Sequence, residues 1–242
     1  MCLTFSVYTL GCKVNSCESA AITAGFIAAG FTSAPEEQQA DICVINSCAV
    51  TSMSVKKARQ HISRCKKDKP ECIVVLCGCF PQAYPEEAHS CGADIITGNA
   101  SKSEIASLVL KHLESRTRIM AVSPLSREFD ESSAATDLDR TRAFIKIEDG
   151  CDRFCTYCII PTARGRVRSR TPQAIMQQAL LAAKSGNREV VLTGINLGCY
   201  GQELGLTLGD AVKAADADGI ERIRLGSLEP EMITPEEIEK LR

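Results

Sequence analysis

Short apolar segments alternate with helical segments along most of the chain, and this alternation restricts the fold more than any other feature. In the first 115 residues four segments have the composition of strands: 4–10, 41–46, 72–76 and 94–97. Four others favour helices: 16–29, 54–67, 84–90 and a segment from Ser101, where Glu104 completes a capping-box pattern. The alternation predicts βαβ units and an open parallel α/β sheet with helices on both faces.

The alternation stops near residue 116 and resumes near residue 141. Between Ser123 and Asp139 there are five acids, one base and a Ser-Ser-Ala-Ala-Thr run, a composition typical of a linker. We therefore expect an N-terminal domain over 1–115, a linker over 116–140 and a second domain over 141–242.

The second domain contains three further strand-like segments, 143–147, 189–192 and 220–225. Its helices are expected from Thr171-Pro172, over 208–215 and from Thr234, where a capping residue precedes Pro and Glu. Three such units are too few to close a (β/α) barrel, and the last helix has no C-cap signal. We expect a partial (β/α) barrel and a chain truncated at its C-terminus, unable to complete full turnover.

Composition excludes several classes of protein. With 45% hydrophobic residues and a net charge of −2, the chain is not predominantly disordered. Its longest apolar stretch, Cys72–Phe80, is far shorter than the roughly 20 residues of a membrane-spanning helix. No signal peptide is visible at the start, so we expect a cytoplasmic protein with no membrane association.

Cysteine is over-represented, with 14 residues against only 3 His. A disulfide-rich secreted protein is disfavoured, because such density serves small chains without a core. In a reducing compartment clustered cysteines bind metals or carry out redox chemistry, and the scarcity of His favours sites made of thiolates alone.

One cysteine run stands directly after a predicted strand. Cys151, Cys155 and Cys158 have the spacing C-x3-C-x2-C, which can bind three irons of a [4Fe–4S] cluster and leave the fourth open. A structural zinc knuckle would need a fourth ligand, and Cys199 is the nearest in sequence. The spacing resembles the cluster loop of radical S-adenosylmethionine (SAM) enzymes, in which the open iron chelates SAM.

A second group of cysteines is dispersed through the first domain. Cys12, Cys48 and Cys79 each lie just past the carboxyl end of a predicted strand, the edge where open α/β sheets bind ligands. By spacing alone Cys77 remains an alternative to Cys79. Four other cysteines lie at less suitable positions. Cys43 is inside a predicted strand, Cys72 is at the start of one, and Cys17 and Cys65 are on predicted helices.

The sequences around these cysteines resemble those of the radical-SAM methylthiotransferases. The first three motifs are Gly-Cys-Lys-Val-Asn from Gly11, Asn-Ser-Cys-Ala-Val-Thr from Asn46, and Gly-Cys-Phe-Pro-Gln from Gly78. The fourth is the run from Cys151 with Ile159-Ile160-Pro161 and the arginine-rich segment to Arg170. The resemblance implies two [4Fe–4S] clusters, bound by Cys12, Cys48 and Cys79 and by Cys151, Cys155 and Cys158, with SAM as cosubstrate.

The first two motifs look most like the family branch that modifies N6-threonylcarbamoyladenosine at tRNA position 37. The implied reaction is methylthiolation of C2 of that adenine. Other branches act on isopentenyladenosine in tRNA or on a ribosomal protein aspartate, and both remain alternatives. The resemblance also implies tRNA (its anticodon loop), a sulfur donor and an external electron donor such as flavodoxin or ferredoxin as partners.

The cofactors carry the difficult chemistry in this family, so we predict no catalytic side chain. Candidate SAM contacts are Tyr157 beside the third loop cysteine and four residues at the ends of the second and third strands, namely Gly194, Asn196, Ser227 and Glu229. Tyr157 could equally pack within the loop, Gly194 serve a turn, and Glu229 lie in a solvated loop.

Two basic clusters are candidates for RNA contact. The first consists of Lys56, Lys57, Arg59, Arg64, Lys66, Lys67 and Lys69; the second of Arg164, Arg166, Arg168 and Arg170. A solvated helix face is the simpler interpretation of the first. Two alternatives to the enzyme also remain, a zinc-dependent RNA-binding module and a thiol-redox sensor.

Overall fold

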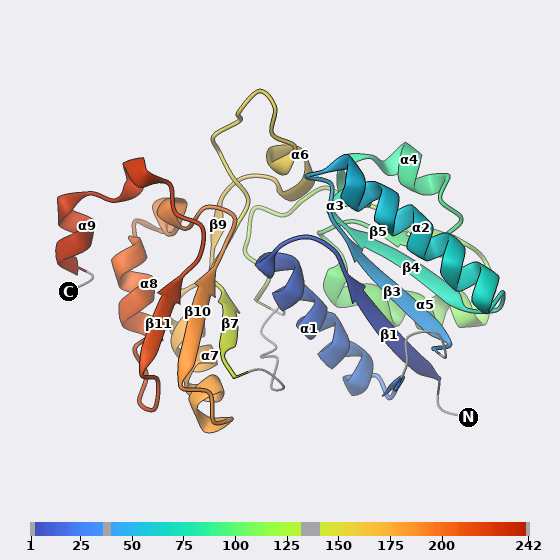
Figure 1. Ribbon diagram of the computed structural model, residues 1–242, viewed down its shortest axis with the longest axis horizontal. Helices are drawn as coiled ribbons and strands as arrows, with labels where there is room; N and C mark the ends of the chain where they lie inside the picture. Colours follow the sequence, from blue (N-terminus) through green and yellow to red (C-terminus); the bar gives the residue numbers. More distant parts are fainter. Residues whose placement is uncertain (1–2, 36–39, 132–140, 241–242) are drawn as a thin grey trace. The chain divides into compact units, whose positions relative to one another are not determined.

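The chain divides into two compact units, and the computed structural model describes residues 3–35, 40–131 and 141–240. The first unit contains residues 1–125 and 157–164, and the second contains 126–156 and 165–242 (Figure 1). Residues 132–140, in the predicted linker, lie outside the described part.

The first unit is built on a parallel sheet of six strands in the order β2-β1-β3-β4-β5-β6. The strands are β1 (Thr4–Thr9), β2 (Thr32–Ser33), β3 (Ile42–Ser47), β4 (Ile73–Gly78), β5 (Ile95–Thr97) and β6 (Ile119–Ala121). All five pairings are parallel, which confirms the open α/β sheet expected from the alternation.

Helices cover both faces of this sheet because alternate strand residues point to opposite sides. On β3, Cys43 and Ile45 pack with Ala58 and Ile62 of α2. Val44 packs on the opposite face, in the core that α1 and α5 also line. The helices are α1 (Lys13–Ala28), α2 (Ser52–Asp68), α3 (Cys79–Ala83), α4 (Pro85–His89), α5 (Ile105–Ser115) and α6 (Ile160–Arg164).

Three local features of this unit differ from expectation. Strands β2 and β6 were not predicted, because two or three residues are too few to show an alternation, and β6 lies in the predicted linker. The Ser101 capping box does not form. Instead a 3-10 turn precedes α5, the Ser101 side chain makes no capping hydrogen bond, and the buried Lys102 in the turn pairs with Glu18 on α1. This tertiary ion pair outweighs the local capping preference.

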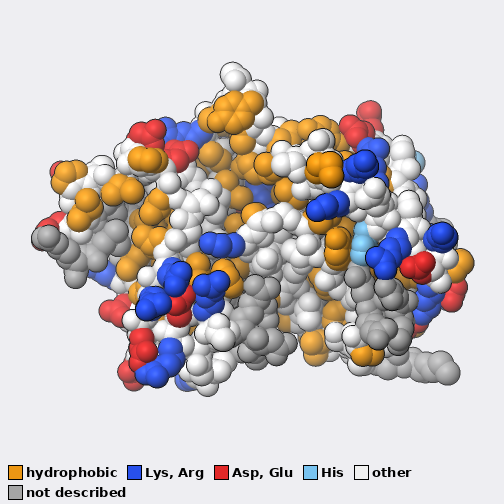
Figure 2. Space-filling view, viewed as in Figure 1, with side chains coloured by type: hydrophobic (Ala, Val, Ile, Leu, Met, Phe, Trp, Pro, Cys, Tyr) orange, Lys and Arg blue, Asp and Glu red, His pale blue; other side chains and the backbone are white. Residues whose placement is uncertain are grey.

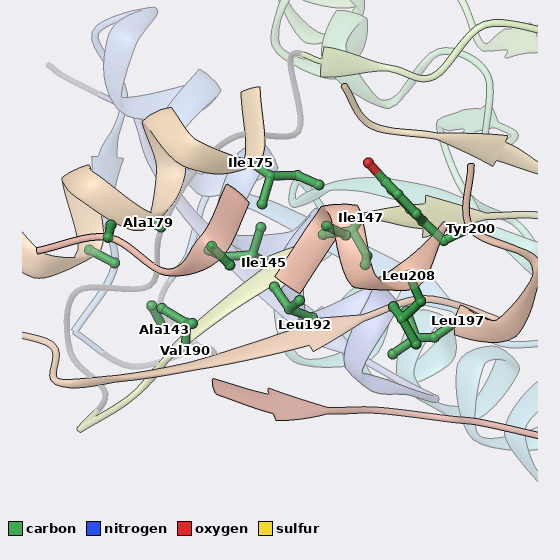
Figure 3. Packing of buried hydrophobic residues seen from close by; sticks show 14 residues of the cluster. Ala143, Ile145, Ile147, Ile175, Ala179, Val190, Leu192, Leu197, Tyr200 and Leu208 are labelled. Carbon is green, nitrogen blue, oxygen red and sulfur yellow. The ribbon is translucent and has the colours of Figure 1, made fainter. Parts of the chain in front are cut away.

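The second unit has a parallel sheet of three strands, β11-β10-β7, formed by β7 (Ala143–Lys146), β10 (Glu189–Thr193) and β11 (Arg222–Leu225). Helix α7 (Pro172–Lys184) lies between β7 and β10 in the sequence, and α8 (Leu208–Ala215) lies between β10 and β11. Helix α9 (Pro235–Lys240) comes after β11. Figure 3 shows Ile175 of α7 beside Ile145 and Leu192 from the sheet. The unit is an open strand-helix array, and its described residues form no closed barrel.

A short antiparallel ribbon accompanies the three-stranded sheet. It pairs β8 (Glu148–Asp149) with β9 (Arg168–Ser169), on either side of the cysteine run in the sequence. Thr171 caps α7 as predicted, because its side chain accepts a hydrogen bond from the backbone N–H of Ala174. Over the part of the chain that the structure describes, every helix is too short or too polar to cross a membrane.

Candidate functional site

Three cysteines of the first unit follow three neighbouring strands of its sheet. Cys12 comes after β1 and caps α1, Cys48 directly follows β3, and Cys79 directly follows β4 as the first residue of α3. Because β1, β3 and β4 are adjacent and parallel, their carboxyl ends meet at one edge. Cys77 lies within β4, fully buried on the face that packs against α1 and α5.

The backbone brings these thiols close together. The pKa of Cys48 is raised by burial and by the neighbouring Cys79 and Cys12 thiols. Gly11 has φ +111°, and a Cβ there would lie 2.8 Å from Cys48 Cβ. Gly78 has φ +97°, and a Cβ there would lie 2.5 Å from the Ser47 carbonyl. Both strand ends therefore require glycine beside the cysteines.

The chemistry of this donor set fits an iron-sulfur cluster. All three thiols are free; Cys12 is exposed, and Cys48 and Cys79 are buried. Among the described residues, no group with ligand atoms all within 4.8 Å of one another contains these thiols, so they are not arranged for a single ion. A four-iron cluster is bound by cysteine thiolates, so the chemistry of these donors fits such a cluster.

Polar groups surround the three thiols. The Val50 N–H donates to Cys48 Sγ over 3.4 Å, and Asn99 Nδ2 lies 3.6 Å from Cys79 Sγ. Asn15 Nδ2 donates to the carbonyls of Leu10 (2.7 Å) and Ser47 (3.1 Å), the residues that precede two of the cysteine motifs. Hydrogen bonds to ligating sulfurs orient them and tune the potential of a bound cluster.

A buried ion-pair network lies beneath this edge of the sheet. Arg164 Nη1 lies 2.8 Å from Glu18 Oε1, and Arg164 Nη2 donates to Asn15 Oδ1 over 2.6 Å. Lys102 also pairs with Glu18. The sequence did not indicate Glu18 as a site residue, since its two partners are distant in sequence.

The structure therefore corrects the interpretation of the arginine run as an RNA-binding surface. Arg164, Arg168 and Arg170 are buried. Arg168 pairs with Asp149 at 3.1 Å and Arg170 with Glu131 at 3.1 Å, each within the second unit. Charges at such positions are compensated by carboxylates rather than available to phosphates. Of the four, Arg166 alone has an exposed side chain.

The basic cluster on and after α2 is partly neutralised. Ion pairs join Lys66 to Asp94, Lys69 to Asp41 and Arg59 to Glu87, each at 2.6 Å, and Arg64 to Asp68 at 3.5 Å. Lys56, Lys57 and Lys67 form no ion pair with another described residue. Figure 2 shows Lys and Arg side chains gathered over α2.

A cavity of about 660 Å³ opens beside Cys48, formed by residues of the first unit. One side consists of the residues after Cys48 and the start of α2, where Lys56 and Arg59 contribute positive charge. Tyr84 and the segment Tyr157–Ile160, which includes Cys158, also line it. Its size and its mixture of aromatic, aliphatic and cationic groups suit a nucleoside-sized ligand.

The cysteine run begins in the second unit, after a turn that requires glycine. Gly150 has φ +90°, and a Cβ there would lie 2.0 Å from the Arg166 carbonyl, while the Cys151 N–H donates to the Gly165 carbonyl over 3.0 Å. Arg166 lies over the Phe154 ring at 5.3 Å and 3.3 Å from Asp152. Cys151 and Cys155 belong to the second unit, and Cys158 to the first.

The predicted SAM contacts differ in their surroundings. Asn196 is buried, and neither its Oδ1 nor its Nδ2 has a hydrogen-bond partner among the described residues, so this amide is suited to bind a polar ligand. The Ser227 carbonyl accepts from the Leu197 N–H, and Glu229 pairs with Arg153 at 2.7 Å. Tyr157 is 90% exposed, in the first unit.

Glu148 is a buried carboxyl that sequence reasoning missed. Its Oε2 accepts the Asn196 N–H over 2.8 Å, and a Cβ on Gly194 would lie 2.6 Å from the same oxygen. Its Oε1 has no hydrogen-bond partner within the described ranges. Burial raises the pKa of Glu148 to about 8, so the side chain is mostly protonated at neutral pH and can donate a hydrogen bond.

We expect Glu148→Gln to flatten the pH dependence of stability. The folded state keeps a proton up to about pH 8 that the unfolded state loses near its ordinary pKa of 4.5. The free energy of unfolding should therefore fall as pH rises between these values, by up to about 1.4 kcal/mol per pH unit. Urea unfolding between pH 5 and 8 measures this slope, with the exposed Glu221→Gln as control. Equal slopes for wild type and Glu148→Gln would contradict the assignment.

Two family models match successive parts of the chain. Residues 4–98 match the family model described as uncharacterized protein family UPF0004, and residues 145–242 match the radical SAM superfamily. Over 98% of its length the chain is 39% identical to a Bacillus subtilis protein named threonylcarbamoyladenosine tRNA methylthiotransferase MtaB. Over 96% of its length the chain is 32% identical to a tRNA-2-methylthio-N(6)-dimethylallyladenosine synthase of Desulfosudis oleivorans.

The chain spans about half the length of these relatives, 54% and 52% respectively. Among solved structures, the radical S-adenosylmethionine methyltransferase TsrM from Kitasatospora setae matches 98% of this chain and 64% of its own, with a TM-score of 0.56. At 11% identity this likeness concerns the fold alone. The two family regions occur in this order, and relatives named as tRNA methylthiotransferases match nearly all of the sequence over about half of their own length.

Proposed function

We propose that this chain is the cluster-binding part of an enzyme that attaches a methylthio group to C2 of N6-threonylcarbamoyladenosine at position 37 of tRNA. The observation that carries the proposal is the cavity beside Cys48, whose wall also contains Cys158. Cys158 of one predicted cluster triad and Ala49, the neighbour of Cys48 in the other, both line this space of nucleoside size. The clusters and SAM, when bound, supply the one-electron chemistry and the methylthio group.

The residues of the chain have positioning roles in this proposal. Cys12, Cys48 and Cys79 bind one cluster, and Cys151, Cys155 and Cys158 bind the other. Tyr84 and Tyr157 offer rings against which the flipped-out base can stack, as single-stranded RNA bases do on aromatic side chains. Lys56 and Arg59 lie where they can contact the adjoining phosphates.

The second predicted binding region lies at the strand ends of the second unit. We assign SAM to the buried Asn196 amide, the protonated Glu148 carboxyl and the loops that carry Gly194, Ser227 and Glu229. Both buried groups have hydrogen-bonding capacity that no described residue uses, which a polar cosubstrate can satisfy.

The choice of substrate follows the relatives' names. The protein named for threonylcarbamoyladenosine is 39% identical and the one named for dimethylallyladenosine is 32% identical. Dimethylallyladenosine is therefore the second candidate, since this similarity is also substantial. A tRNA substrate places the enzyme in the cytoplasm, with a low-potential electron donor and a sulfur donor as partners.

Nucleoside analysis tests the proposal. The complete product of the gene is expressed in a bacterial strain that lacks its own enzyme for 2-methylthio-N6-threonylcarbamoyladenosine, and tRNA hydrolysates are analysed by mass spectrometry. We expect the 2-methylthio form to appear with wild type and not with Cys151→Ala. Appearance of the 2-methylthio form of dimethylallyladenosine alone would assign the protein to the other branch. Absence of both would overturn the proposal.

A further inference from the structure

A second cysteine cluster lies in the first unit, apart from the predicted iron-sulfur ligands. Cys43 Sγ, Cys65 Sγ and a ring nitrogen of His61 all lie within 4.8 Å of one another. The two sulfurs are 3.2 Å apart. This is the only group of three metal-ligating side chains at such close range among the described residues.

The local structure explains the convergence. His61 and Cys65 are four residues apart on α2, so they lie on the same face of the helix. Cys43 lies on the face of β3 that packs against α2. The Tyr8 ring stacks on the His61 ring with centroids 3.9 Å apart and planes at 1°, which fixes the orientation of the imidazole.

A third thiol completes the group. Cys72, immediately before β4, interacts electrostatically with Cys43 and Cys65, and the Cys43 backbone N–H donates to its sulfur. His61, Cys65 and Cys72 line a cavity of about 20 Å³, large enough for one water molecule or one metal ion. One imidazole and two thiols therefore line a space of the right size for an ion, and the Cys43 sulfur lies within 4.8 Å of the ligand atoms of His61 and Cys65.

This group is distinct from the predicted cluster site. Cys43 lies near the amino end of β3 and Cys48 just past its carboxyl end. They are five positions apart along the extended chain, roughly 16 Å at about 3.3 Å per residue. The two groups therefore occupy opposite edges of the same sheet.

We propose that Cys43, His61, Cys65 and Cys72 bind a single structural Zn²⁺. A Cys3His donor set is a standard closed tetrahedral zinc site. Tetrahedral geometry with Zn–S bonds near 2.3 Å would hold the sulfurs about 3.8 Å apart, so Cys43 and Cys65 need to separate only slightly. A disulfide between these two cysteines would leave His61 and Cys72 unused, and a reducing cytosol disfavours it.

The surroundings suit the charge of the filled site. Three thiolates and a neutral imidazole around Zn²⁺ carry a net charge of −1, and binding releases three thiol protons. Lys66 and Lys69 favour the ionised form of Cys72, although burial still raises the pKa of this thiol to about 11. Ser6 pairs with Cys43 in the β1–β3 register and can hydrogen bond to its sulfur. The ion would join β3, the last turns of α2 and the start of β4.

Element-specific measurements on the full chain test the site. The protein is reconstituted anaerobically with iron and sulfide so that its cluster cysteines are filled, then exposed to Zn²⁺ and desalted. We expect one zinc per chain and a zinc-edge X-ray absorption spectrum with about three sulfur and one nitrogen ligands. His61→Ala and Cys65→Ala should weaken zinc affinity at least tenfold in competition with a chelator.

Matched variants separate this site from the cluster site and from folding defects. Cys91→Ala removes a thiol outside the group and should leave zinc binding unchanged. If His61→Ala and Cys65→Ala fail to fold, the wild-type absorption spectrum still decides. A spectrum without nitrogen, unchanged affinity in both variants, or a Cys43–Cys65 disulfide with no zinc uptake after reduction would each overturn the proposal.

Discussion

Replacing Cys12 with Ala should remove about half of the protein's iron and leave reductive cleavage of SAM intact. The reason is that Cys12, Cys48 and Cys79 are all located at one edge of the first unit's sheet, whereas Cys151 and Cys155 belong to the second unit. The measurements are iron and sulfide content, electron paramagnetic resonance and formation of 5′-deoxyadenosine after anaerobic reconstitution.

Two cysteines offer matched controls for this experiment. Cys77 lies two residues from Cys79 but is fully buried, and burial raises the pKa of its thiol to about 12, so Cys77→Ala should retain all the iron. Burial likewise raises the pKa of Cys199 to about 11, and Cys199→Ala should behave the same way. Loss of SAM cleavage in Cys12→Ala, with the second cluster still visible by spectroscopy, would contradict the division of roles.

Replacing Arg164 with Ala should destabilise the first unit by about 3–5 kcal/mol, the usual effect of removing one partner of a buried ion pair. The change leaves Glu18 buried with Lys102 alone and removes a hydrogen bond to Asn15. Since Asn15 also holds the carbonyls of Leu10 and Ser47, the loops that carry Cys12 and Cys48 should loosen as well.

Urea unfolding of the two variants Arg164→Ala and Arg166→Ala measures this effect. The Arg166 side chain is exposed, so its removal should change stability by no more than about 0.5 kcal/mol. Equal effects of the two substitutions would show that the buried network does not contribute to stability as argued. Slower reconstitution of the first cluster in Arg164→Ala alone would confirm its coupling to the cysteine loops.

Much of the fold was predictable because its main strands are apolar and separated by recognisable helices. The predicted segment 41–46 differs from β3 by one residue at each end, and 189–192 differs from β10 by one residue at its carboxyl end. Strands β2 and β6 could not be found in this way, since their pairing depends on neighbouring strands rather than on a local pattern. The 3-10 turn before α5 depends on a contact between Lys102 and Glu18, 84 residues apart.

The candidate site was predictable to the extent that it follows strand ends. The placement of Cys12, Cys48 and Cys79 at one edge of the sheet was predictable because parallel strands bring their carboxyl ends together. The arginine run was misread because a sequence shows charges but not their partners. Arg164 and Glu18 are 146 residues apart. The spacing of His61 and Cys65 is visible in the sequence, but the approach of Cys43 to them depends on how α2 packs on β3.

The placement of Cys12, Cys48 and Cys79 on three separate strands also has a consequence for the order of events during synthesis. These thiols converge only after β1, β3 and β4 have paired, so this site has a high contact order and cannot form before residue 79 has left the ribosome. Cys151, Cys155 and Cys158 are within eight residues of each other, and an unfolded chain can already bring them together. If the two triads bind iron as proposed, iron at the first would stabilise only the folded sheet, whereas iron at the second would also be captured by the nascent chain.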